Sequence, residues 1–100
     1  MSEETWGFAP APFKPDEALQ RLRRDLRDMG LSEREGVFER RGLALARATV
    51  RDGHLAAAVV RKPSRNSPEW QERSLKTSAD VREFTQHLKR QLAQWSDRDD

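Results

Sequence analysis

The feature that most restricts the fold is a pair of small apolar segments on either side of Asp52-Gly53. Residues 43–51 and 54–62 consist largely of alanine, valine and leucine. An Asp-Gly pair between two such segments is a strong signal for a two-residue β-hairpin, because both central positions of a type I′ turn need a positive φ. The sequence therefore predicts an antiparallel hairpin in which Arg51 pairs with His54.

A further strand is predicted at 37–39, joined to the hairpin by the sequence Arg40-Arg41-Gly42. A two-residue loop would force Arg41 to a positive φ at a steric cost. We therefore expect a three-residue loop that places Gly42 at the left-handed position after a type I turn.

Two other segments are less regular. Residues 69–76 alternate loosely and are predicted to form a fourth strand at an edge of the sheet. Residues 32–35 have the spacing of a capping box, so we expect a loop or one helical turn there. The prediction is thus a meander of three or four antiparallel strands.

Amphipathic helices are predicted before and after these strands. Pro15, followed by two acidic residues, is typical of a helix start, and Gly30 is typical of a helix end. The second helix is expected to begin at Thr77 or Ser78. Their apolar stripes are Ala18, Leu19, Leu22, Leu26 and Met29 in the first helix, and Val81, Phe84, Leu88, Leu92 and Trp95 in the second. The fold class is therefore α+β, in the order helix, meander, helix.

The predicted register divides the strands between two faces. One face carries mainly small residues, which allow close helix packing, so both helices are expected on it. Its members are the pairs Val50/Leu55, Ala48/Ala57 and Ala46/Val59, with Phe38 beside Ala44. The opposite face is predicted to carry Val37, Leu43, Leu45 and Val60.

The length of 100 residues, 35% of them hydrophobic and 36% charged, fits one small domain with one core. We expect an extended arm at 1–13, with aromatic residues between prolines, a single α+β domain at 14–96 and a frayed tail at 97–100. No apolar run is long enough to cross a membrane and no leader is recognisable, so a soluble, cytoplasmic protein without membrane partners is expected.

The residues that support catalysis or metal binding are scarce. The chain has no cysteine and two histidines, His54 and His87, which leaves no thiolate or all-histidine metal site. Neither histidine has a catalytic partner nearby in sequence, and no phosphate loop, dinucleotide motif or calcium loop is present. We expect a protein that is not an enzyme and that takes no metal and no cofactor.

Two functions remain open. The preferred hypothesis is a protein-interaction module that self-associates, as a homodimer for example, or binds a protein partner, because surplus apolar residues occur on one predicted sheet face and on the arm. The expected interface residues are Val37, Leu43, Leu45, Val60, Trp6 and Phe8.

The alternative is a nucleic-acid-binding domain, because residues 36–76 hold nine basic and four acidic side chains. The expected contact residues are Arg47, Arg51, His54, Arg61 and Lys62. The order helix, three strands, helix resembles the double-stranded-RNA-binding fold in topology only. That family carries a lysine cluster at the start of its second helix, where this chain has Lys76 followed by Thr77-Ser78-Ala79-Asp80.

Overall fold

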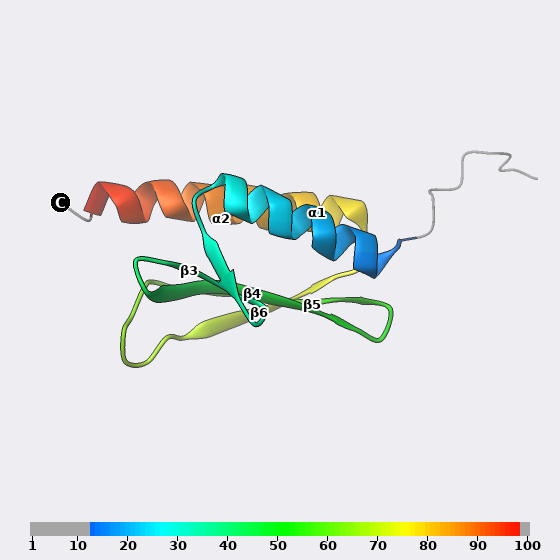
Figure 1. Cartoon of the computed structure of the whole chain (residues 1–100), viewed down its shortest axis with the longest axis horizontal. Coiled ribbons are helices and arrows are strands. Elements are labelled where there is room, and N and C mark those ends of the chain that lie inside the picture. The colour runs from blue at the N-terminus through cyan, green and yellow to red at the C-terminus, as the bar shows by residue number, and fades with distance from the viewer. Residues whose placement is uncertain (1–12, 99–100) are drawn as a thin grey trace, which may run out of the picture.

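A computed structural model describes residues 13–98 of the chain, with side chains described to residue 95. Two helices and a five-stranded antiparallel sheet form an α+β fold, and the strands follow one another in the sheet in the order of the chain. The elements are α1 (Pro15–Asp28), β2 (Ser32–Arg34), β3 (Val37–Arg40), β4 (Leu43–Arg51), β5 (His54–Val60), β6 (Trp70–Leu75) and α2 (Ser78–Arg98). Both helices lie on the same side of the sheet (Figure 1). The residues of the predicted arm that precede Phe13 lie outside the described part, and α2 includes the first two residues of the predicted tail.

Three two-residue turns, each ending in glycine, connect β2 through β5. The central residues all have positive φ, as a type I′ turn requires: Glu35 and Gly36 (51° and 82°), Arg41 and Gly42 (56° and 79°), and Asp52 and Gly53 (51° and 80°). Arg51 pairs with His54, so the hairpin predicted around Asp52-Gly53 is confirmed.

The three-residue loop predicted between β3 and β4 is wrong. Arg40 pairs with Leu43, so the turn contains only Arg41 and Gly42, and Arg41 adopts a positive φ of 56°. The twist of a type I′ turn matches the right-handed twist of the strands that it joins. That match outweighs the steric cost at a single arginine. The prediction considered this steric cost but not the twist of the turn.

The extra residue lies within β4 instead. Phe38 pairs with Ala46 and the next residue, Glu39, pairs with Ala44, which leaves Leu45 as a β-bulge. The predicted neighbours Phe38 and Ala44 are therefore not opposite each other. The bulge also reverses the alternation of the first residues of β4, because side chains change side at every residue of a regular strand.

The bulge decides which side Leu43 occupies. Phe38 shares a side with Glu33, its partner in β2, and Glu33 is bonded to Arg23 of α1, so this is the helix side. Arg40 is two residues after Phe38 and lies on the helix side together with its partner Leu43. The prediction that Leu43 shares a face with Val37 is therefore wrong.

Residues 32–34 form strand β2 rather than a loop or a helical turn. The Glu35-Gly36 turn places β2 against β3, and the Nε of Arg23 donates to both carboxylate oxygens of Glu33 at 3.0 and 2.8 Å. The predicted count of three or four strands is thus one or two short. The strand predicted within 69–76 is confirmed as β6.

The core lies between the helices and the sheet. The helix α2 begins where predicted: the Asp80 N–H donates to Thr77 Oγ1 at 3.0 Å, and the Lys76 N–H donates to Asp80 Oδ2 at 2.9 Å. The whole predicted stripe of α2 is buried, as are the two central leucines of α1. Ala46, Ala48 and Ala57 give both helices room to approach the sheet.

Candidate functional site

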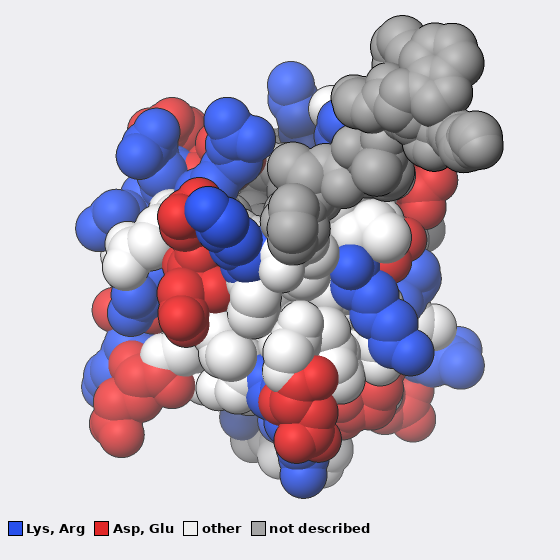
Figure 2. All heavy atoms as spheres, turned by 90° about the vertical axis from the view of Figure 1, so that its right-hand side faces the viewer, with Lys and Arg blue, Asp and Glu red and all other residues white. Residues whose placement is uncertain are grey.

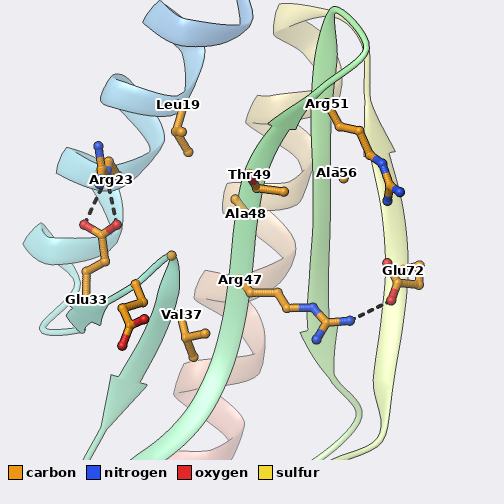
Figure 3. Close-up of a pocket in the computed structure, with 12 residues that line it drawn as sticks. Leu19, Arg23, Glu33, Val37, Arg47, Ala48, Thr49, Arg51, Ala56 and Glu72 are labelled. Carbon is orange, nitrogen blue, oxygen red and sulfur yellow. Dashed lines mark hydrogen bonds and ion pairs between the residues drawn. The ribbon is translucent and has the colours of Figure 1, made fainter.

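The side of the sheet that faces away from both helices, here called the open side, carries a row of three paired residues, one from each of β4, β5 and β6. Arg47 pairs with Ala58, and Ala58 pairs with Glu72. The Arg47 Nη2 donates to Glu72 Oε2 at 2.7 Å, so the ion pair crosses β5 above Ala58 (Figure 3). Ala58 is fully buried, which is consistent with its place beneath this bridge.

Arg47 also stacks on an aromatic ring of the neighbouring row. Its Cζ lies 4.5 Å from the centroid of the Trp70 ring, a distance at which the cation is attracted by the face of the ring. Trp70 pairs with Val60, which is 2% exposed. The apolar residues at this end of the open side therefore lie under a polar layer made by Arg47 and Glu72.

The next row of the open side is made of small residues and is hollowed. Thr49 pairs with Ala56, and Ala56 pairs with Ser74. Thr49 and Ala56 line a hollow, which Arg47 and Glu72 bound on one flank and Arg51 on another (Figure 3). The hollow continues past the Glu35-Gly36 turn to two residues of α1, Leu19 and Arg23.

Strand β4 is unpaired on one side within this hollow. The first residue of β3, Val37, pairs with Arg47, and the Ala48 N–H donates to the Gly36 carbonyl at 3.1 Å. Residues 49–51 of β4 extend beyond that point and have no partner in β3. Arg51 pairs with His54 across a two-residue turn and Thr49 pairs with Ala56, so the backbone groups of these two residues point to β5. The backbone N–H and carbonyl of Val50 point away from β5, beside the hollow.

The structure separates the predicted interface residues. Val37 is half-buried on the open side and lines the hollow. Leu45 is 1% exposed within the core, and Leu43 is half-buried against the core from the helix side. Val60 is on the open side but buried, and Trp6 and Phe8 lie outside the described residues. Among the described four, Val37 alone combines exposure with a place on the open side.

The five predicted nucleic-acid contacts are also separated in space. Arg51 ends β4 and pairs with His54 at the start of β5. Arg61 and Lys62 follow the other end of β5, about 23 Å from His54 at the rise of a strand. The predicted central residue, Arg47, is bound to Glu72, and Arg61 Nε lies 3.9 Å from Glu69 Oε1. Cationic and anionic side chains alternate on the end of the molecule seen in Figure 2. No continuous cationic strip results from these residues.

The histidines have different surroundings. His54 Nδ1 lies 3.4 Å from the Asp52 carbonyl oxygen beside the hairpin turn. Burial lowers the pKa of His87 from 6.5, and the positive charges of Arg73 and Arg90 lower it further. Three or more potential metal ligands do not gather anywhere in the described part of the chain, and no helix there is both long and apolar enough to cross a membrane.

The sequence reasoning missed the cluster of Arg47, Trp70 and Glu72. Its signal was the two-residue spacing of Trp70 and Glu72, which places both on one side of an edge strand. Recognising Arg47 as their partner needed the pairing of β6 with β5, and the long connection at residues 61–69 does not reveal that register.

Comparisons with known proteins give no family for this chain. No family model, no curated protein and no solved structure matches it.

Proposed function

We propose that the protein is a small non-enzymatic module that binds protein, either a second copy of itself or a different partner, through the open side of its sheet. The observation that carries the proposal is the end of β4 at residues 49–51, which lacks a partner in β3 and where Val50 points its backbone groups away from β5, beside a hollow lined by small residues. Unpaired strand backbone in such a position can accept an extended segment of another chain. Arg51 and Thr49 are exposed there.

The charges favour a protein partner over nucleic acid. Nucleic acid binding depends on several cations that neutralise successive phosphates. On the open side, Arg47 is already held by Glu72 and by the ring of Trp70. An interface with paired charges, an aromatic ring and small apolar residues is typical of protein recognition.

A photoreactive side chain at Thr49 tests the proposal, because Thr49 is exposed and lines the hollow. Illumination of the purified protein, and of the protein returned to its native cell extract, should give one dominant covalent product from this position. The same group at Gln86, an exposed position on α2, is the matched control and should give none. Equal yields from the two positions would reject the open side as a binding surface.

Sedimentation of the purified chain then separates the two kinds of partner. A dimer that dissociates in the Arg51→Glu variant indicates self-association, and a monomer that is cross-linked only in extract indicates a different protein. The nucleic-acid alternative predicts a mobility shift with mixed RNA or DNA at low salt, abolished by Arg47→Glu together with Arg51→Glu. A shift of that kind, without a protein product from Thr49, would replace the proposal by the alternative.

A further inference from the structure

Strand β6 presents a long unpaired edge. It is an outer strand of the sheet, and β5 is its partner within the described part of the chain. The Arg61 N–H donates to the Glu69 carbonyl at 3.0 Å, which fixes the alternation of the antiparallel ladder. The backbone groups of Gln71, Arg73 and Leu75 therefore point to β5, and those of Trp70, Glu72 and Ser74 point outward. This edge offers an N–H and a carbonyl at every second residue.

Two cations flank the edge on the helix side. Arg73 belongs to β6 and Arg90 to α2, and both are exposed. Neither forms an ion pair with a carboxylate of the described chain. Both lie close enough to His87 to lower its pKa. The helix side of the β6 edge therefore carries two exposed cations that form no ion pair with the described part of the chain.

The strand is poorly suited to pair with a second copy of itself. A two-fold axis perpendicular to the sheet would place two copies of β6 antiparallel, with the helices of both copies on the same side of the sheet. Paired residues then have their side chains on the same side, so the axis must pass through a residue rather than between two residues. The two registers that overlap most of Trp70–Leu75 are centred on Glu72 and on Arg73. The first places two glutamates opposite each other and the second places two arginines opposite each other, and directly opposed like charges destabilise a sheet.

We propose that the β6 edge takes an extended segment of a different protein as an added strand, with an acidic side chain of that segment opposite Arg73 on the helix side. The outward backbone groups supply the main-chain hydrogen bonds, and Arg73 and Arg90 select the acidic residue. The proposal rests on the proposed function as a protein-binding module, but it uses the strand edge rather than the hollow beside β4.

A short blocked peptide of alternating threonine and valine with one central glutamate tests the backbone part. It is titrated to millimolar concentration into the full chain, and amide hydrogen exchange is followed residue by residue. The amides of Trp70, Glu72 and Ser74 should become protected, and those of Gln71 and Arg73 should not change, because they already bond to β5. Protection of the Val50 amide in β4 instead, or no protection at millimolar peptide, overturns the proposal.

The charge part is tested with the same peptide carrying glutamine or lysine at its centre. Cross-strand pairs of opposite charge contribute enough for the glutamate peptide to bind about fivefold more tightly than the glutamine peptide, and the lysine peptide should bind more weakly still. The double variant Arg73→Gln with Arg90→Gln should remove this preference. The control Arg24→Gln, at an exposed position of α1, should keep it. Equal binding of the three peptides overturns the assignment of an acidic partner.

A proline at residue 74 separates strand addition from other modes of contact. Ser74→Pro removes an outward N–H without removing a bond to β5, which an edge strand tolerates, whereas Ser74→Ala keeps the N–H. Ser74→Pro should abolish peptide binding at unchanged secondary structure, and Ser74→Ala should not. A dimer of the unmodified chain that only Ser74→Pro dissociates would overturn the proposal in favour of a second copy. Cross-linking from Thr49 is read independently, so failure at the β6 edge is distinguishable from failure of the proposed function.

Discussion

Leu45 provides the sharpest test of how the sheet packs, because the bulge makes it a core residue of β4. It is 1% exposed within the core cluster. Leu45→Ala removes three buried carbon atoms, at about 0.8 kcal/mol each for transfer to water, and leaves part of the vacated volume empty. We expect the free energy of unfolding to fall by about 3 kcal/mol, within the range of about 2 to 5 kcal/mol typical of buried leucines.

Urea denaturation followed by circular dichroism measures this loss directly. In a domain of this size it corresponds to a fall in melting temperature of roughly 12 to 24 °C. Val50→Ala is the matched control, since Val50 lies on the same strand and is 36% exposed. It should cost about 1 kcal/mol, because the change removes only two carbon atoms and part of the side chain remains in water. Equal losses for Leu45→Ala and Val50→Ala would refute the bulge-based packing and would return Leu45 to an accessible surface.

Other features of the structure lead to three more predictions. Arg47→Ala should lower the free energy of unfolding by about 1 to 2 kcal/mol in urea titrations, since it removes the stack on the tryptophan ring and a largely exposed ion pair. Glu72→Gln removes the ion pair alone and should cost less than about 1 kcal/mol; equal losses would show that the stack contributes nothing. Glu35→Asn should raise stability by about 0.5 kcal/mol, because asparagine adopts a φ near 51° more readily than glutamate, and a lower melting temperature would contradict this. His87 has a pKa lowered from 6.5 by burial and by two nearby arginines, so the unfolded chain binds the proton more readily and stability falls as the pH drops below that value. The fall between about pH 7.5 and 5.5 should be smaller in His87→Gln, and an unchanged fall would contradict the assignment.

The elements with strong local signals could be predicted from the sequence. The Asp52-Gly53 turn determines the pairing of β4 with β5 through backbone conformation alone. The apolar spacing of α2 is long and regular enough to identify every buried residue of its stripe. In both cases the determining interactions lie within the segment itself, and no distant part of the chain had to be known.

The pairing of β3 with β4 could not be predicted in the same way. Whether a residue is added in the turn or in the strand depends on the balance between the strain at Arg41 and the burial gained at Leu45. The sequence pattern indicates the strain at Arg41. It does not indicate the burial of Leu45, because that burial depends on where the helices pack. One bulged residue then moves Leu43 to the other side of the sheet and changes the composition of the open side.

The two edge strands of the sheet, β2 and β6, differ in how many hydrogen bonds they can offer to an added strand. At one end β2 has three residues, and its Glu33 is held by Arg23 of α1. Such a short edge gives an added strand few hydrogen bonds. At the other end β6 has six residues, and the side chains of Trp70 and Glu72 contact Arg47 on the open side while their backbone groups point outward. An added segment at β6 would therefore lie beside the same tryptophan and glutamate that cover part of the open side. The ion pair and the stack restrict the motion of these two side chains. A partner strand that binds along the edge therefore has less side-chain entropy to remove.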